Sequence, residues 1–341
     1  MVFAAFPGSD VSESASESPQ AESRPRLGRW ARLTISAAVL ALFLFLGHRH
    51  LGELHRLAEA SLPIVALMFG CVALGRVGQG RTIQLLLLPL GHAMRFRDGF
   101  FISNLTGLSN LLLPRAGVGT AALYLNRRHE VPFSDYGSIT VFLALLDAVA
   151  TGLVGLLSLA LAAALTAAPF DLRIALAFAG VVLGGVAATQ IRMDLPARFD
   201  GRIARFLRSL GTGWKKLKVH GSAMARIAAI RLLLLPLTAV RLQLAFIALG
   251  VDVPFLGVLL AAMLGTLAQI SSITPAGIGI REAAVAYAAS AIGCTPATAL
   301  AAAVLDRLVT TVFLIVAGQI GLWRSMAGGL MREEGNDSAR R

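Results

Sequence analysis

The sequence predicts an all-α integral membrane protein, a polytopic helix bundle of about 7–8 spans with two Pro/Gly-broken, re-entrant helices in an internal repeat. Of the 341 residues, 56% are hydrophobic and only 15% are charged, and a soluble chain of this length needs a more polar surface. Several apolar runs reach the length of about 20 residues that a helix needs to cross a bilayer. No run shows the alternating pattern of a membrane β-strand. The third observation is a repeated motif that interrupts two of the apolar runs.

The net charge of +12 does not indicate a nucleic-acid partner, because the basic residues flank apolar runs as they do in membrane proteins. Two cysteines are too few for a disulfide framework, and no Cys/His cluster has metal-ligand spacing. We therefore expect no cofactor and no metal.

The N-terminal residues 1–29 are rich in Ser, Glu and Pro, so we expect a disordered cytoplasmic tail. Arginines before the first span, about Leu33 to Gly47, should hold this tail in the cytoplasm. A second span begins at Leu62 and ends at Leu74 or, past two arginines, near Leu90.

The segment from Phe100 to Leu125 is apolar but contains three glycines, Pro114 and several Asn, Ser and Thr residues. Proline and glycine interrupt helical hydrogen bonds, and exposed backbone is not tolerated against lipid. We expect a re-entrant or broken helix that lines a protein-enclosed cavity. A kinked span is the alternative.

The remaining elements alternate between apolar spans and polar connections within a membrane domain of residues 30–323. The loop 190–224 is basic and follows two crossings, so it is expected in the cytoplasm. The polar tail 324–341 is too short to be a domain. The predicted helices are Ser138–Leu165, Leu172–Thr189, Ile227–Gly250, Phe255–Ile273, Arg281–Ile292 and Ala297–Trp323.

The same short motif stands in both halves of the chain, about 60–165 and 225–323. The first copy reads Leu-Leu-Pro-Arg-Ala-Gly-Val-Gly over 112–119, and the second reads Ile-Thr-Pro-Ala-Gly-Ile-Gly over 273–279. Asp147 follows the first copy at nearly the distance at which Asp306 follows the second, and each precedes a threonine. A matched pair of broken segments is the best sequence pointer to a transporter's substrate site. Chance recurrence in a chain rich in Ala, Gly and Leu is the alternative.

Charged residues beside the two breaks are the candidate site, since a charge in the bilayer costs at least about 2.5–3.5 kcal/mol and usually has a partner. Arg281 and Glu282 stand where a helix would begin, and free N–H groups there favour anions. The alternative is a set of buried ion pairs that only fix helix register. Arg231 and Arg241 are interpreted as residues near span ends. The predicted substrate-binding residues are Asn110, Pro114, Arg115, Gly117, Gly119, Asp147, Pro275, Gly277, Gly279, Arg281, Glu282, Asp306 and Arg307.

These motifs resemble the membrane domain of the lysylphosphatidylglycerol synthase family, the flippase-like part of multiple peptide resistance factor proteins. The resemblance rests on 110–125, on 274–282 and on Leu-Asp-Arg at 305–307, and it covers about residues 35–322. The second motif matches a Pro-Gly-Gly-x-Gly-x-x-Glu pattern closely. The first departs from the family, because Arg115 follows the proline directly and Val118 stands where Glu is usual.

The resemblance implies a multi-span protein that moves or handles an anionic lipid. We expect a flippase-like translocase for an anionic phospholipid or a polyprenyl-phosphate-linked lipid. Arg115 and Arg281 would engage the phosphate. The alternative is a membrane enzyme, or an accessory subunit of a lipid-headgroup or glycolipid transferase, with Glu282 or Asp306 as general base.

Two further expectations concern activity and setting. The chain shows no Walker motif, no catalytic set and no soluble aminoacyl-transferase domain, so neither ATP hydrolysis nor enzyme activity is expected. We expect a multi-pass protein of the bacterial cytoplasmic membrane, with a lipid substrate and a membrane or soluble synthase as partners. The span count puts both motifs nearest the cytoplasmic side, which suits parallel halves, and one miscounted segment would make the halves inverted, so the sequence leaves both arrangements open.

Overall fold

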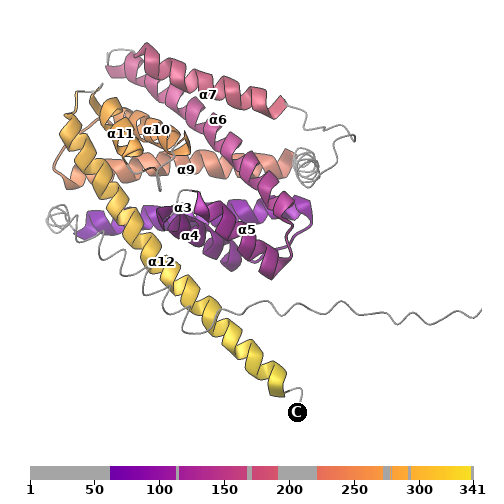
Figure 1. Ribbon diagram of the computed structural model, residues 1–341. Helices are drawn as coiled ribbons and strands as arrows, with labels where there is room; N and C mark the ends of the chain where they lie inside the picture. Colours follow the sequence, from indigo (N-terminus) through magenta and orange to yellow (C-terminus); the bar gives the residue numbers. More distant parts are fainter. Residues whose placement is uncertain are drawn as a thin grey trace, which may run out of the picture. The chain divides into compact units, whose positions relative to one another are not determined.

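All elements of the described chain are helices, as the sequence predicts (Figure 1). The computed structural model describes residues 62–112, 115–166, 171–190, 221–271, 277, 279–290 and 293–338. Beyond residue 320 only the backbone is described. Several predictions lie outside the described residues: the tail 1–29, the first span, residues 191–220 of the basic loop 190–224, Pro114 and Pro275. The elements are α3 (Leu62–Leu87), η1 (Leu88–Leu90), α4 (Phe96–Leu112), α5 (Ala116–His129), α6 (Phe133–Thr166), α7 (Leu172–Gln190), α9 (Gly221–Ala248), α10 (Phe255–Ser271), α11 (Ile280–Ser290) and α12 (Pro296–Ser338).

Five of these helices are long and apolar enough to cross a membrane, which confirms an all-α membrane bundle. They are Leu62–Leu90, Phe133–Leu165, Leu172–Gln190, Gly221–Ala248 and Pro296–Ile320. Several boundaries differ from the prediction, and two of the differences have a local cause. Helix α6 begins at Phe133, directly after Pro132, since proline readily precedes a helix. The backbone of α12 stays helical to Ser338, because no proline interrupts it.

The two predicted breaks each divide a helix into a hairpin of two short helices. Helices α4 and α5 pack on each other in the first half, and α10 and α11 do so in the second. Helix α10 has only 17 residues and packs along α11, the next described helix of the chain. Both hairpins stand between a long helix before them and a long helix after them. The order α3-α4-α5-α6 therefore recurs as α9-α10-α11-α12.

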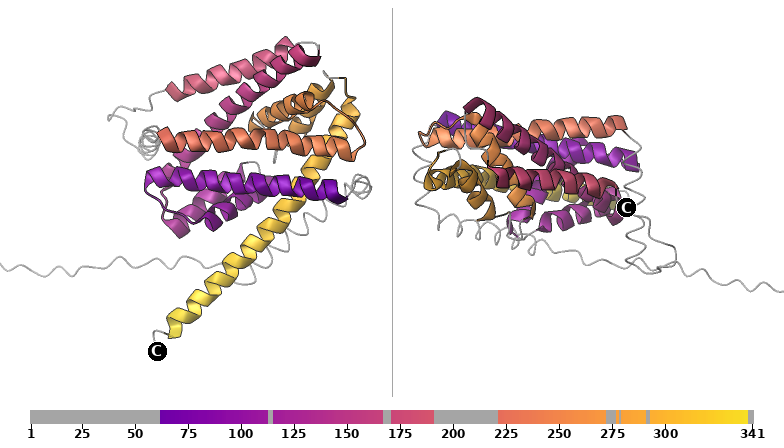
Figure 2. Two further views of the ribbon diagram at one scale, coloured as in Figure 1. Left: turned by 180° about the vertical axis from the view of Figure 1, so that it is seen from behind. Right: turned by 90° about the horizontal axis from the view of Figure 1, so that it is seen from above.

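The two halves are inverted with respect to each other. Helices α3 and α9 pack side by side but run in opposite directions, and α6 and α12 also run oppositely (Figures 1 and 2). Gly78 lies against Leu234, while Cys71 and Arg241 line one recess, so numbers rise along α3 as they fall along α9. The sequence leaves parallel and inverted halves open, and the described helices have the inverted arrangement.

Polar side chains form contacts between the helix connections at each of the two ends of the bundle. At the α3–α4 end (residues 88–99 and 125–136), His92 Nε2 lies 3.3 Å from Asp135 Oδ2, and His129 pairs with Asp98. At the α9–α10 end (171–173, 249–254 and 290–296), the Tyr287 hydroxyl donates to Asp171 over 3.2 Å. One hairpin thus enters the bundle from each end. Each packs on the closing helix of the other half, α4 on α12 and α10 on α6.

Candidate functional site

The two breaks line a single cavity of about 510 Å³ between the halves. The first break contributes Asn110 and Arg115, and the second contributes Gln269, Gly277 and Arg281. The repeated aspartates, Asp147 from α6 and Asp306 from α12, also line it. The two sequence motifs therefore meet in space, as a matched pair of broken helices in a transporter does.

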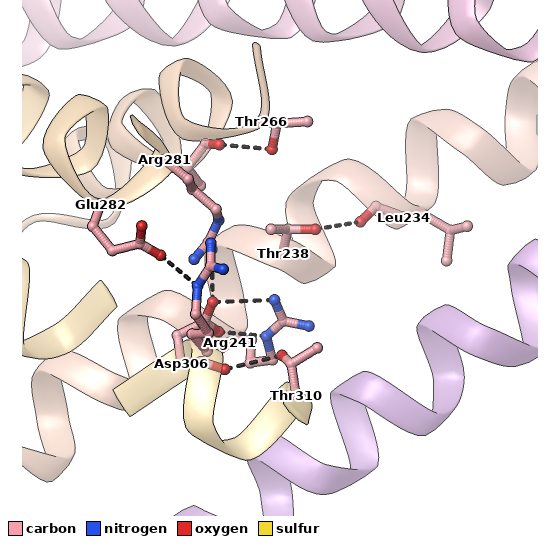
Figure 3. Close-up of polar contacts among 10 residues, drawn as sticks. Leu234, Thr238, Arg241, Thr266, Arg281, Glu282, Asp306 and Thr310 are labelled. Atoms are coloured by element: carbon pink, nitrogen blue, oxygen red, sulfur yellow. Dashed lines mark hydrogen bonds and ion pairs between the residues drawn. The ribbon is translucent and has the colours of Figure 1, made fainter. Parts of the chain in front are cut away.

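Asp306 is the most buried charge of this cavity, with none of its side chain exposed. Arg241 of α9 donates to both of its carboxylate oxygens, and Arg281 Nη2 of α11 donates to Oδ2 over 2.6 Å (Figure 3). The hydroxyl of Thr310 adds a bond of 2.9 Å to the Asp306 carbonyl. One carboxylate thus joins three helices and holds two arginines in fixed positions.

The start of α11 is bound to α12 by two ion pairs. Besides the pair of Arg281 with Asp306, Glu282 Oε1 lies 2.5 Å from Arg307 Nε. Glu282 Oε2 also accepts the Gly279 N–H over 2.7 Å, which caps the first turn of α11. This backbone donor, predicted to face a phosphate, therefore serves the protein's own carboxylate. Gly279 has φ +86° and Gly277 has φ +73°, so both occupy the left-handed region that favours glycine.

At the first break, a side chain of α4 accepts a backbone N–H from the first turn of α5. Asn110 Oδ1, near the end of α4, accepts the Gly117 N–H of α5 over 2.7 Å. A Cβ at Gly117 would lie 2.3 Å from the Thr106 carbonyl oxygen, whereas one at Gly119 would meet nothing within 4 Å. Only Gly117 is therefore required by packing. Arg115 adopts φ +58° at the break, which is uncommon for a residue with a side chain.

Asp147 forms the looser counterpart of Asp306. Its Oδ1 lies 3.4 Å from Arg231 Nε, and 31% of its side chain is exposed. Asp147 is consequently the carboxylate more open to a ligand.

Positive charge exceeds negative charge around the cavity. The six arginines that line it exceed the carboxylates Asp147, Asp306 and Glu282 by three. Arg76 of α3 has no carboxylate partner among the described residues, and its Nη1 donates to Gln79 Oε1 and the Ser103 carbonyl, each over 3.2 Å. The arginines are Arg76, Arg115, Arg231, Arg241, Arg281 and Arg307.

Most of the predicted residues come together here. Those that line the cavity are Asn110, Arg115, Asp147, Gly277, Arg281, Asp306 and Arg307. Three others do not line the cavity but form hydrogen bonds that hold the two breaks: Gly117 donates to Asn110, and Gly279 donates to Glu282. Gly119 has no evident role in the described structure. Sequence reasoning missed Arg76 and set aside Arg231 and Arg241. All three are charged residues inside predicted spans, and a charge inside a span is by itself enough to identify a candidate site residue.

Comparison with known proteins agrees with this architecture. Residues 29–318 match the family model described as the lysylphosphatidylglycerol synthase TM region. The chain is also 27% identical, over 86% of its length, to glycosyltransferase AglD of Haloferax volcanii. The chain spans about half, 54%, of the length of this curated relative. No solved structure matches the chain.

These comparisons identify a membrane protein of lipid or glycolipid handling. The expectation that the chain is not an enzyme is contradicted by the match to a protein named a glycosyltransferase. It rested on the lack of a soluble aminoacyl-transferase domain and of a readable catalytic set. The polar residues that line the cavity are spread over seven helices, so they form no contiguous motif in the sequence.

Proposed function

Because this chain belongs to the lysylphosphatidylglycerol synthase transmembrane family, we propose that it is the membrane component of a lipid-headgroup or glycolipid transferase. In this role it holds the phosphate of a lipid-linked substrate inside the bundle. The observation that carries the proposal is the cavity, where arginines outnumber carboxylates by three. The match to a glycosyltransferase supports the glycolipid form.

Physical chemistry favours a phosphate as the occupant. Several guanidinium groups without matching carboxylates are costly within a bilayer unless an anion joins them. Arginine presents a planar fork that binds phosphate oxygens in pairs. The cavity lies among helices long enough to span, so a bound headgroup would leave its chains in lipid.

The residues divide into two roles in this proposal. Arg241 and Arg281 are held by Asp306 and present their remaining N–H groups as a fixed cradle. Asp147, the more exposed carboxylate, is the group that would meet the sugar or headgroup. A membrane or soluble synthase is the expected partner.

The orientation proposed for the chain follows from its arginines. At the α3–α4 end, four arginines lie in a connection or in the adjoining helix turns, namely Arg95, Arg97, Arg127 and Arg128. At the α9–α10 end, Arg173 in the first turn of α7 is the one arginine so placed among the described residues. The positive-inside rule puts the α3–α4 end in the cytoplasm. We place the chain in the bacterial cytoplasmic membrane with its N-terminus in the cytoplasm.

Translocation of the same lipid is the second candidate. It is favoured by one observation, the inverted repeat in which two broken hairpins enter from opposite ends and meet at the cavity. This arrangement is common in proteins that open alternately to the two sides of a membrane.

Two measurements test these functions. Native mass spectrometry of the purified protein should detect a co-purified phosphate-bearing lipid, which Arg281→Gln should lose and the peripheral Arg173→Gln should retain. In liposomes, a labelled lipid that changes mass with the partner present indicates a transferase component. Redistribution between leaflets without a mass change indicates a translocase. A protein that retains no phosphate-bearing lipid would refute both.

A further inference from the structure

A second, smaller recess opens between α3 and α9. Its volume is about 170 Å³, and all its lining residues come from these two helices. Three arginines line it, Arg76, Arg231 and Arg241, and each of them also lines the main cavity. Gln79 and Thr238 are shared in the same way. The recess therefore borders the main cavity across a row of hydrogen-bond donors.

The geometry of α9 spreads these donors along the recess. Arg231 and Arg241 are ten residues apart, which is about 15 Å along a helix axis. Arg76 reaches the recess from the facing helix α3. A row of guanidinium groups of this length exceeds what one phosphate needs.

Arg76 is the least compensated of the three. Arg231 and Arg241 each pair with an aspartate, whereas Arg76 donates only from Nη1, to an amide oxygen and a carbonyl, among the described residues. Arginine has five N–H donors, so most of those of Arg76 remain for a ligand. They lie where the recess and the cavity meet.

We propose that the anionic group bound here is a diphosphate, with one phosphate in the main cavity, the other in the α3–α9 recess, and Arg76 between them. This inference rests on the proposed function, since it names the chemistry of the lipid that the cavity takes. A diphosphate carries about two to three negative charges, whereas a phosphodiester carries about one. The diphosphate therefore balances the surplus of three arginines that a single phosphodiester leaves mostly unpaired.

Glycines of α3 provide a matched pair of variants. A Cβ at either Gly75 or Gly70 would meet nothing within 4 Å, so both positions accept a side chain without a backbone clash. Gly75 lines the recess, whereas Gly70 lies on the exposed face of the same helix. Gly75→Leu should fill the recess, and Gly70→Leu should change only the helix propensity, which both variants share.

The test measures the affinity of the full chain in nanodiscs for farnesyl diphosphate and farnesyl phosphate. We expect the diphosphate to bind about tenfold more tightly, a difference of about 1.4 kcal/mol. Gly75→Leu should remove this preference while leaving the affinity for the monophosphate, and Gly70→Leu should keep it. Arg76→Gln should weaken the binding of both compounds, because Arg76 lines the main cavity as well, and should weaken that of the diphosphate more. If inorganic pyrophosphate competes as well as the farnesyl compound, the diphosphate site stands and its source is soluble.

Three outcomes would overturn the inference, and they are distinguishable. Equal affinities of the wild-type protein for both farnesyl compounds would refute the assignment of a diphosphate but would leave the proposed function intact. A preference that survives in Gly75→Leu would place the second phosphate elsewhere. If the wild-type protein binds neither farnesyl compound, the proposed function is refuted as well.

Discussion

Neutralising Asp306 should destabilise the protein more than any other single change in the cavity. Its side chain is fully buried and accepts hydrogen bonds from both Arg241 and Arg281. In Asp306→Asn these two guanidinium groups lose their carboxylate, and neither has another among the described residues. The variant keeps the volume of the side chain, so the charge is the main change.

The magnitude follows from this burial. Removing one partner of a buried ion pair costs about 3–5 kcal/mol, and here two arginines depend on one partner. Since a protein is stable by only about 5–15 kcal/mol, the loss is a large part of the total. Asp147→Asn is the matched control. Its carboxylate is 31% exposed and meets a single arginine at 3.4 Å, so we expect a loss of about 1 kcal/mol or less.

The assay is the free energy of unfolding in bicelles, followed by circular dichroism as denaturant is added. The double variant Arg241→Gln/Asp306→Asn should lose less than the sum of its two single variants, because the buried arginine has gone with its partner. Equal losses in Asp306→Asn and Asp147→Asn would refute the reasoning that Asp306 joins the three helices.

Three further outcomes are expected. Gly117→Ala should reduce the yield of folded protein in size-exclusion chromatography while Gly119→Ala does not, because only the first methyl group meets a carbonyl oxygen; equal yields would contradict this. Burial holds the pKa of His129 below 6.5, so its contribution to stability is complete above pH 6.5 and decreases as the pH falls below it. His129→Gln should flatten that slope in thermal melts, and an unchanged slope would assign it to other groups. In a background without the native cysteines, Asp252→Cys should react with an impermeant thiol reagent in intact cells and Arg97→Cys should not; the reverse pattern would invert the orientation.

The positions of the breaks could be predicted from the sequence because their cause is local. Proline and glycine act on the backbone where they stand, and the second motif indeed separates α10 from α11. The same local signal cannot tell Gly117 from Gly119. The difference is the Thr106 carbonyl oxygen, and its place depends on how α4 packs on α5.

Buried ion pairs were an alternative that the sequence offered, but which residues pair could not be predicted, because the partners are distant in sequence. Arg241 and Asp306 are 65 residues apart and meet only because α9 and α12 cross at the cavity. Helix α10 has the composition of a span, and only its packing against α11 shows that it turns back. Composition fixes how apolar a helix is, whereas neighbouring helices decide where it goes.

Helix α7 determines how the two halves are oriented relative to each other in the membrane, because it changes the number of described crossings between them from even to odd. In each half only the first and last of the described helices are long and apolar enough to cross, and with these crossings a half begins and ends on the same side of the membrane. Two such halves joined directly would have the same orientation. Among the described helices, α7, which packs on α6, is the one candidate crossing between the halves, and a single crossing there turns the second half over. A helix that contributes no side chain to the cavity thereby decides that the two breaks face each other across it.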